Sequence, residues 1–318
     1  MKTIITVGSG YSGSSAVYEY LRLTNLFFDP FPDKEFSLIY DPGGISDIEN
    51  CLLNNFTPTK NKIIYDNFLE NIKFYTSPDR GLKPGKNIKI KSHNLNIILK
   101  EYLNSITSVV YEGESNFIKF NNSRLINLYK KFLFKFNKRV KGKMTLFCDI
   151  NDFEYKTKEL FLKLFSQNNI NKKDVILDQG GNIWRPYSST KYFPNPKILI
   201  IHRDPRDIFS EFKTKTASAY PGNNVYQFCA WYENIISKIH ISEYQNSNIL
   251  KLNFEDFVLN NIEAIKNISN FLSLEIYNEK VNFDFNYSKK NIKRYKNNLS
   301  NLEIEQIENK LKKYLYNI

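Results

Sequence analysis

The sequence predicts an α/β fold in which helices flank a parallel sheet, and three observations support that class. A β-branched run at residues 3–7 is followed by a turn rich in Gly and Ser and then by apolar residues at helical spacing. Continuous apolar runs at residues 175–177 and 197–202 are typical of parallel strands buried on both faces. Helical patterns alternate with these runs, which is the element order of an α/β sandwich.

The segment after the first helix predicts loops and two further helices. Pro and Gly recur in residues 26–60 and again in 76–87, which is typical of loops around short elements. Residues 94–105 and 123–136 carry apolar residues at helical spacing, with Lys on the opposite face. We expect both helices to cover the core, and we expect a short strand at residues 88–91.

The C-terminal part of the chain is mainly helical. Apolar spacing predicts helices at residues 208–215, 226–240, 262–272 and 302–316, and one more strand at residues 250–252. With 318 residues, of which 42% are hydrophobic, the chain can bury one large core or a core with a substantial insertion.

The turn after the first strand has the composition of an anion-binding loop. Glycine permits positive φ and close backbone approach, so consecutive N–H groups can converge on an anion. The positive end of the following helix dipole adds to that preference for phosphate or sulfate. Ser14 stands where a P-loop kinase has its phosphate-binding Lys, so this is not a typical ATPase loop. The candidate cofactor-binding residues of the loop are Gly10, Tyr11, Ser12, Gly13, Ser14 and Ser15.

A second motif follows the strand predicted at residues 197–202. Arg203 comes directly after that strand, at the edge where open α/β sheets bind their ligands. Asp204 can cap the next helix and Pro205 suits its first position. Ser210 lies on the same predicted helix, so Arg203 and Ser210 together can bind one phosphate, the Arg as a bidentate donor.

In combination, the first loop, Arg203-Asp204-Pro205 and Ser210 resemble the sulfotransferases that use 3′-phosphoadenosine 5′-phosphosulfate (PAPS). The resemblance implies a P-loop-NTPase-like parallel sheet and transfer of a sulfuryl group from PAPS to an acceptor hydroxyl. It implies that the first loop holds the 5′-phosphosulfate and that Arg203 and Ser210 hold the 3′-phosphate.

Further stretches are similar to the same family. Trp231 falls where the family has a Trp on the next helix, and residues 250–257 are similar to its strand followed by Tyr-Glu-Asp-Leu. Residues 271–274 resemble its Phe-Leu-Gly-Leu helix end, and residues 295–316 its closing segment. We therefore predict one sulfotransferase domain over residues 1–318. A poorly matched insertion, largely helical and loop, is expected at about residues 40–170 and on the acceptor side.

The first loop departs from the family pattern at Tyr11. Family members usually carry Lys or Arg there, which helps to neutralise the oxygen that leaves with the nucleotide. Tyrosine brings a hydrogen-bond donor without a charge, so either another cation takes the role or the chain is inactive. Composition alone offers four candidate cations: Lys91, Arg185, Lys293 and Arg294.

Three residues are candidates for the catalytic base that takes the acceptor proton. Glu35 follows the first helix, where some members of the family carry a Glu base. His93, in Lys91-Ser92-His93, is similar to a Lys-Thr-His stretch of small-molecule sulfotransferases, although it lies too far from Arg203 in sequence. Asp178 ends the strand predicted at residues 175–177. The sequence leaves all three open and slightly favours Glu35.

Charge and composition restrict the partners and the location. A formal net charge of +12 predicts anionic partners, but the Lys residues are scattered and no nucleic-acid module is present. The 25 Phe and 21 Tyr could stack on sugar rings, which favours a carbohydrate or glycoconjugate acceptor, and the charge also suits an acceptor at a membrane surface. The apolar N-terminal stretch ends at Gly8, too early for a signal peptide, so we expect a cytoplasmic protein. Three distant cysteines without a C-x-x-C pattern argue against a disulfide scaffold or structural zinc, and no metal is expected.

Two other functions stay open. A P-loop kinase or other nucleotide-dependent enzyme is the first, because residues 144–149 read as an apolar strand ending in Asp149, a possible magnesium ligand. A non-catalytic binder of anions or nucleotides is the second, suggested by the net charge.

Overall fold

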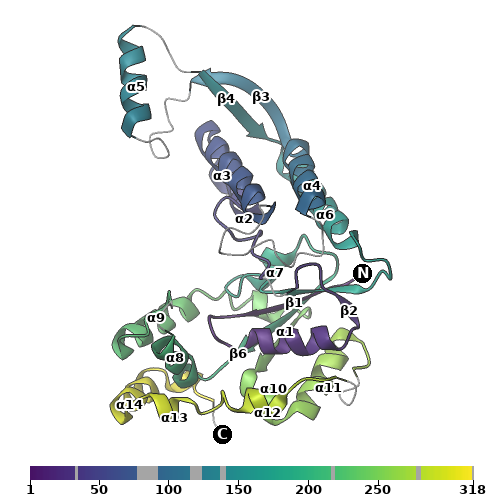
Figure 1. The fold of residues 1–318 in the computed structure, drawn as a ribbon, viewed down its shortest axis with the longest axis vertical. Coiled ribbons are helices and arrows are strands. Elements are labelled where there is room, and N and C mark those ends of the chain that lie inside the picture. The colour runs from purple at the N-terminus through teal and green to yellow at the C-terminus, as the bar shows by residue number, and fades with distance from the viewer. Residues whose placement is uncertain are drawn as a thin grey trace. The chain divides into compact units, whose positions relative to one another are not determined.

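The computed structural model describes residues 1–32, 35–76, 92–114, 124–136, 141–215, 219–276 and 281–316. The chain divides into two compact units (Figure 1). The first unit joins Met1–Phe36 to Asn169–Ile318, and the second is Ser37–Asn168. The assignment of residues 1–318 to one sulfotransferase domain stays a prediction.

The first unit is built on a five-stranded sheet in the order β2-β5-β1-β6-β7. Each adjacent pair of strands is parallel, which confirms the predicted α/β class. The strands predicted at residues 3–7, 175–177, 197–202 and 250–252 are confirmed as well, because their apolar runs form the three central strands and one edge strand of this sheet. The strands are β1 (Thr3–Gly8), β2 (Phe27–Phe28), β5 (Asp174–Asp178), β6 (Pro196–His202) and β7 (Ile249–Asn253).

The register of the sheet brings its functional segments to one edge. Thr6 of β1 pairs with Asp178, the last residue of β5. Gly8, the last residue of β1, pairs with Ile201 near the end of β6. The carboxyl ends of three neighbouring strands therefore meet where the Gly-rich loop begins and where Arg203 follows β6.

Helices cover the sheet and enclose two apolar clusters. One cluster joins α1, α10 and α11 to the sheet through residues such as Leu21, Phe257 and Ile268. The other lies among α8, α9, α13 and α14 and includes Phe209 and Phe228. The helices of this unit are α1 (Ser14–Leu23), α7 (Pro186–Thr190), α8 (Pro205–Thr214), α9 (Val225–Ser237), α10 (Phe254–Leu259), α11 (Asn261–Leu272), α12 (Phe285–Lys289), α13 (Tyr295–Asn298) and α14 (Asn301–Lys310), with short 3-10 turns η1 (Glu243–Gln245) and η3 (Lys312–Tyr314).

The C-terminal helices follow the predicted pattern except at their ends. Helix α9 stops at Ser237 rather than at residue 240, and α14 stops at Lys310. The prediction of one helix over residues 302–316 was therefore wrong beyond Lys310, where the chain makes the short turn η3. Buried Ile307 and Leu311 fix this segment against α8 and α9, so packing rather than helical spacing sets its end.

The second unit consists of helices and one antiparallel strand pair. Its core contains Phe68, Leu99, Phe153 and Phe161, all essentially inaccessible to solvent. The expected insertion of helices and loops is thus mainly helical, but it also contains two strands, and only β4 overlaps a stretch that the sequence suggested as a strand, residues 144–149. The elements are α2 (Ile45–Asn54), α3 (Pro58–Thr76), α4 (Ser92–Ser105), β3 (Thr107–Glu114), α5 (Arg124–Lys135), β4 (Lys141–Phe147) and α6 (Ile150–Ser166).

Three expectations for this unit have different outcomes. The helix predicted at residues 94–105 is confirmed as α4, with Leu95, Leu99 and Leu103 buried. The helix predicted at residues 123–136 forms as α5, but four of its apolar side chains, and Phe136 directly after it, are exposed, so the expectation that it covers the core was wrong. The strand expected at residues 88–91 lies outside the described residues.

Asp149, the possible magnesium ligand of the kinase alternative, has a structural role here. It follows the antiparallel strand β4 and not a strand of the parallel sheet. Its carboxylate caps α6 by accepting hydrogen bonds from the backbone N–H groups of Asn151 and Asp152. In the part of the chain that the structure describes, no helix combines the length and apolar character needed to cross a bilayer.

Candidate functional site

The loop between β1 and α1 has the backbone geometry of an anion cradle. Gly13 has a φ of 88°, and a Cβ built there would lie 2.4 Å from the ring of Phe254, so glycine is required. Gly10 is tightly packed too, because a Cβ there would lie 2.5 Å from the ring of Tyr220. Helix α1 starts at Ser14 without a side-chain cap on its first N–H groups. These N–H groups and the helix dipole remain directed at the space in front of the loop.

The hydroxyl groups of Ser12, Ser14 and Ser15 have different surroundings. Ser14 Oγ accepts a hydrogen bond from Gln179 Nε2 at 2.9 Å. Ser15 Oγ donates to Asp178 Oδ2 at 3.2 Å. Ser12 Oγ is buried and has no hydrogen-bond partner among the described residues. The loop is therefore tied to the end of β5 by its last two serines.

Two of the three candidate bases lie side by side at the end of β5. Glu35 forms a parallel β-bridge with Asp178, and the backbone N–H of Phe36 donates to the carbonyl of Asp178 at 2.9 Å. Asp178 is buried, and its Oδ1 also accepts a hydrogen bond from Thr6. Burial, followed by the nearby charge of Glu35, raises the pKa of Asp178 to about 6. Glu35 is exposed by surface area, yet the groups around its carboxyl partly desolvate it and raise its pKa.

The third candidate base, His93, lies elsewhere in the chain. It belongs to the first turn of α4 in the second unit, whereas Glu35 and Asp178 belong to the first. The side chain of His93 is not among those that the structure describes. Its role stays a prediction, as do the roles of Glu35 and Asp178.

Arg203 lies directly against the first loop. Its Nη1 donates to the carbonyl oxygen of Tyr11 at 3.0 Å, and its Nη2 donates to the carbonyl oxygen of Asn291 at 2.6 Å. The residue is buried, and its Nε has no hydrogen-bond partner in the described part of the chain. Ser210 is also buried, and its Oγ accepts a hydrogen bond from Asn298 Nδ2 at 2.8 Å. As predicted, Asp204 caps α8 by accepting from the N–H of Arg206.

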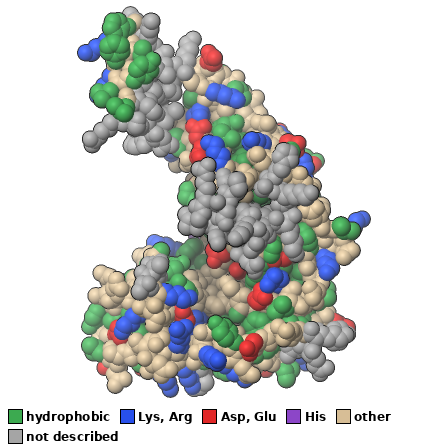
Figure 2. All heavy atoms as spheres, viewed as in Figure 1, with side chains coloured by type: hydrophobic (Ala, Val, Ile, Leu, Met, Phe, Trp, Pro, Cys, Tyr) green, Lys and Arg blue, Asp and Glu red, His purple; other side chains and the backbone are tan. Residues whose placement is uncertain are grey.

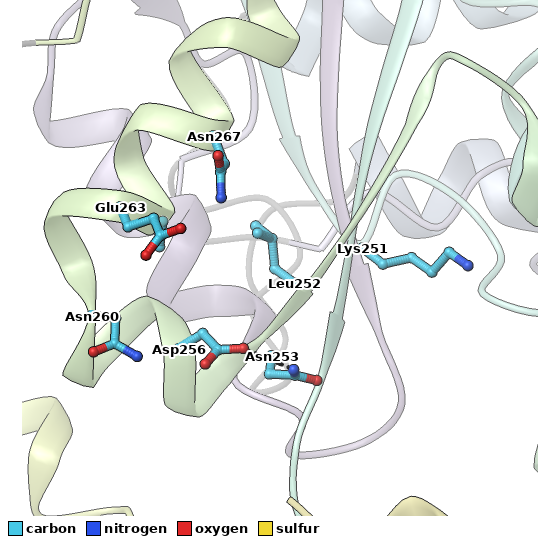
Figure 3. A pocket seen from close by; sticks show the side chains of 8 residues that line it. Lys251, Leu252, Asn253, Asp256, Asn260, Glu263 and Asn267 are labelled. Atoms are coloured by element: carbon cyan, nitrogen blue, oxygen red, sulfur yellow. Dashed lines mark hydrogen bonds between the residues drawn. The ribbon is translucent and has the colours of Figure 1, made fainter.

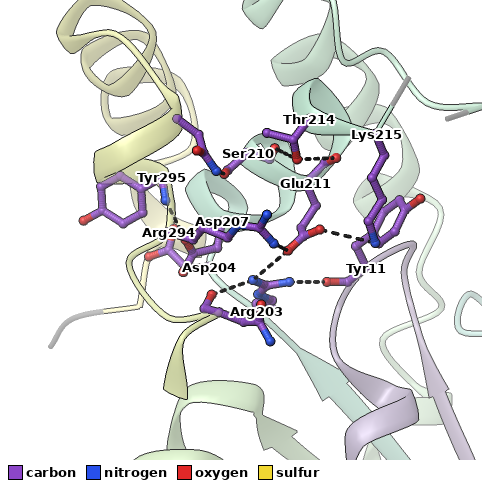
Figure 4. A network of polar contacts seen from close by, with 12 residues as sticks. Tyr11, Arg203, Asp204, Asp207, Ser210, Glu211, Thr214, Lys215, Arg294 and Tyr295 are labelled. Atoms are coloured by element: carbon purple, nitrogen blue, oxygen red, sulfur yellow. Dashed lines mark hydrogen bonds and ion pairs between the residues drawn. The ribbon is translucent and has the colours of Figure 1, made fainter. Parts of the chain in front are cut away.

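Glu211 is the centre of a charged network that the sequence reading missed (Figure 4). Its carboxylate lies 3.8 Å from Arg203 Nη2, 2.9 Å from Arg294 Nη1 and 3.3 Å from Lys215 Nζ. Three cations thus surround one buried carboxylate. The sequence contained a sign of this network, since Lys215 follows Glu211 by four residues, an ion-pair spacing at the end of the helix that carries Ser210.

Tyr11, which replaces the family's basic residue, belongs to an aromatic cluster. Its ring packs edge-on against Phe212 and Tyr220. Phe212 and Tyr220 are stacked with ring centroids 4.5 Å apart, and Trp231 packs edge-on against both. Lys215 Nζ lies 4.1 Å from the centroid of the Tyr11 ring (Figure 4). A cation is therefore present beside Tyr11, but a different element supplies it.

Two pockets lie near the carboxyl ends of β6 and β7. One, of about 300 Å³, is lined by Arg203 and by Asp204, Glu255 and Tyr316, among others. The other, of about 330 Å³, lies between β7 and α10–α11 (Figure 3). Its lining includes Asn, Asp and Glu side chains but none of the predicted cofactor-binding residues. Within the described ranges, no three His, Cys, Asp or Glu side chains are grouped as ligands for a metal ion.

Comparison with known families agrees with the motifs. Residues 124–279 match the model described as the sulfotransferase family. This match confirms the resemblance to sulfotransferases that the two motifs predicted. The matched segment contains Asp178, Arg203, Ser210 and Trp231 but not the first loop.

Solved structures show more distant similarity. The sulfotransferase domain of the olefin synthase from Synechococcus PCC 7002 is 11% identical, with a TM-score of 0.44, and the match covers 100% of this chain and 96% of that one. The sulfotransferase domain of the curacin biosynthetic pathway is also 11% identical, with a TM-score of 0.43, and coverage is 98% and 97%. Retinol dehydratase in complex with androsterone and inactive cofactor PAP is 13% identical, with a TM-score of 0.39, and coverage is 98% and 80%. No curated protein sequence matches the chain.

Proposed function

We propose that the chain transfers the sulfuryl group of PAPS to an acceptor hydroxyl and releases adenosine 3′,5′-diphosphate. One observation carries this proposal. The Arg203 guanidinium donates to the Tyr11 carbonyl at 3.0 Å, so the two segments expected to bind the two ends of the nucleotide lie side by side. Mouse sulfotransferase SULT7A1, a distant structural relative, forms a complex with PAP, the nucleotide that this reaction would release.

The donor would be held by groups that the protein leaves available. The N–H groups of Ser14 and Ser15 at the start of α1 would bind the 5′-phosphosulfate, with the helix dipole favouring its charge. Arg203 would bind the 3′-phosphate, and its unpartnered buried Nε supports that role. Ser210 accepts a hydrogen bond from Asn298, so its own hydroxyl proton remains available for the same phosphate.

In the transfer step, the acceptor oxygen forms a bond to sulfur while the bond from sulfur to the 5′-phosphate oxygen breaks. The acceptor proton would pass to Glu35, whose exposure allows an acceptor to reach it. Its raised pKa makes it a stronger base than an ordinary carboxylate. Asp178 is buried and bonded to Ser15 and Thr6, which suits a positioning role for the loop. His93 remains an alternative base.

Lys215 would supply the positive charge that Tyr11 lacks. Its ammonium lies over the Tyr11 ring and pairs with Glu211, so it is held beside the loop. Negative charge grows on the leaving phosphate during transfer, and a positioned cation stabilises that charge. Two of the four cations proposed from the sequence can be commented on. Arg294 also pairs with Glu211, and Lys91 lies outside the described residues.

A carbohydrate hydroxyl is the proposed acceptor. Tyr220 is 37% exposed and packs on Gly10 of the loop, so it offers an aromatic face on which a sugar ring could stack. The kinase alternative has less support, because Ser14 replaces the phosphate-binding Lys and Asp149 caps α6.

Two measurements test the proposed function. Melting temperature should rise with adenosine 3′,5′-diphosphate but not with ATP and magnesium, because only a ligand that binds the folded state stabilises it. Radiolabelled PAPS should then transfer its sulfur to a panel of 4-nitrophenol, glucose and N-acetylglucosamine. A rise with ATP and magnesium alone would favour the kinase alternative. Binding of adenosine 3′,5′-diphosphate without transfer to any acceptor would favour a nucleotide binder.

A further inference from the structure

Helix α5 is carried on the connection between two paired strands of the second unit. Glu114 ends β3 and pairs with Lys141, which begins β4. The 26-residue connection, residues 115–140, therefore starts and ends at neighbouring positions of the strand pair. Within it, α5 spans Arg124–Lys135, about three turns of helix.

One face of α5 is apolar and exposed. Leu125, Leu128, Tyr129, Phe132 and Phe136 follow a spacing of three and four residues, which places them on one side of a helix. Their exposed fractions run from 58% for Phe132 to 77% for Leu125. Figure 2 shows hydrophobic side chains gathered on the outer surface of this helix. A contiguous group of large apolar side chains of this kind marks an interaction surface. We call these five residues the α5 apolar face.

Basic residues accompany the α5 apolar face. Lys131 and Lys135 are exposed and lie one turn apart on the helix, next to Leu128 by helical spacing. Between residues 124 and 143 the sequence contains no Asp or Glu. The Lys and Arg residues of that stretch are Arg124, Lys130, Lys131, Lys135, Lys138, Arg139, Lys141 and Lys143.

These properties favour one kind of partner over the others. A second copy of the chain would bring an equally basic stretch against the first, and like charges would repel. Nucleic acid would use the charge but would leave five large apolar side chains in water. An anionic bilayer accommodates both the apolar side chains and the positive charges, because apolar side chains enter the acyl boundary while flanking lysines reach the head groups.

We propose that α5 binds anionic membrane surfaces, lying in the interface with the α5 apolar face inserted. This assignment does not depend on the proposed sulfuryl transfer, since it uses only the surface of the second unit. Each Lys or Arg close to an anionic surface strengthens binding by roughly fivefold. The range of charge attraction in solution is about 10 Å at 0.1 M salt and about 3 Å at 1 M salt. Binding should therefore weaken as the salt concentration rises.

Flotation of the full chain with lipid vesicles tests the proposal. We expect binding to vesicles of 30% phosphatidylserine in phosphatidylcholine and little binding to pure phosphatidylcholine. Leu125→Ser combined with Leu128→Ser should reduce binding at least about tenfold, since both side chains would lose burial in lipid. Lys131→Gln combined with Lys135→Gln should reduce it roughly 25-fold, or fivefold per lysine.

Matched variants outside α5 separate this role from general surface properties. Ile262→Ser with Leu302→Ser removes apolar side chains of similar exposure, 78% and 64%, from other helices. Lys158→Gln with Lys266→Gln removes two exposed charges elsewhere. Both controls should bind vesicles like the wild type. Absence of binding to phosphatidylserine vesicles overturns the proposal, and so does equal loss in the control variants. A wild-type dimer in sedimentation equilibrium that Leu125→Ser with Leu128→Ser dissociates, without vesicle binding, would assign the face to self-association instead.

Discussion

Arg203 and Tyr11 are 192 residues apart in the sequence, yet the Arg203 guanidinium donates to the Tyr11 carbonyl at 3.0 Å. Tyr11 has a φ of 60°, in the left-handed region, and this conformation is part of the turn that presents its carbonyl to Arg203. The contact joins the end of β6 to the loop after β1, and these two strands are adjacent in the sheet. The proposed donor site is built across this junction.

Replacing Arg203 by Lys should selectively weaken binding of the 3′-phosphate. Lysine keeps the charge but loses the planar, bidentate geometry, so affinity for adenosine 3′,5′-diphosphate should fall about 10- to 100-fold. Adenosine 5′-monophosphate lacks that phosphate, and its affinity should change little. Titration calorimetry with both nucleotides measures the difference. Equal losses for the two nucleotides would mean that Arg203 supports the loop rather than the 3′-phosphate.

Replacing Glu35 by Gln should remove the proposed base while leaving the donor site intact. Loss of a positioned base lowers turnover by about 10²- to 10⁴-fold. In the wild type, turnover should rise with pH through the raised pKa of Glu35, because only the ionised carboxylate accepts a proton. Initial rates against pH and the affinity for adenosine 3′,5′-diphosphate give both readouts. Turnover near that of the wild type in Glu35→Gln would reject this base and leave His93 and Asp178.

Replacing Asp178 by Asn should change how stability depends on pH. The folded-state pKa of about 6 exceeds the ordinary value of 3.8, so ionisation of Asp178 costs stability as pH rises through this range. The full loss of stability corresponds to about 3 kcal/mol. It is reached above the folded-state pKa and is absent below about pH 4. The free energy of unfolding, measured with urea, should therefore exceed that of the wild type by more at pH 7.5 than at pH 4 when Asp178 is replaced by Asn. A constant difference between the two proteins would contradict the buried, destabilised carboxylate.

Replacing Lys215 by Met should lower turnover more than donor affinity. The ammonium is expected to act on charge that grows during transfer, so its loss should reduce kcat by about 10²-fold or more. Lys215→Arg should retain much of the activity, since it keeps a cation. The matched control is Lys213→Met, because Lys213 lies on the same helix but pairs with Glu303. A normal kcat in Lys215→Met would mean that another cation stabilises the leaving phosphate. The candidates would then be Arg294, Lys293 and Arg185.

The sequence predicted the parallel sheet well because its strands carry continuous apolar runs. Strands β1, β5, β6 and β7 each contain a predicted stretch and extend beyond it by one or two residues. Arg203 could be placed beside the first loop because parallel strands end at one edge of a sheet. The neighbouring positions of Glu35 and Asp178 could not be predicted, since the bridge between them depends on how the chain returns after α1.

Other features depended on tertiary packing and left weaker signals. Glu211 was missed because a Glu in an amphipathic helix ordinarily faces solvent, whereas here Arg203, Arg294 and Lys215 surround it. Strand β4 overlaps the apolar run at residues 144–149, but its partner β3 was missed because Val109, Val110 and Tyr111 are exposed and form no buried apolar run. Helical spacing predicted α5 correctly but could not say which surface its apolar residues would contact.

A crystal structure of the protein with adenosine 3′,5′-diphosphate would show whether one nucleotide spans the two motifs. We expect the 5′-phosphate within hydrogen-bond distance of the Ser14 and Ser15 N–H groups. We expect the 3′-phosphate on Arg203 and Ser210 of the same site. A nucleotide bound elsewhere, or one whose 3′-phosphate contacts neither Arg203 nor Ser210, would contradict this expectation.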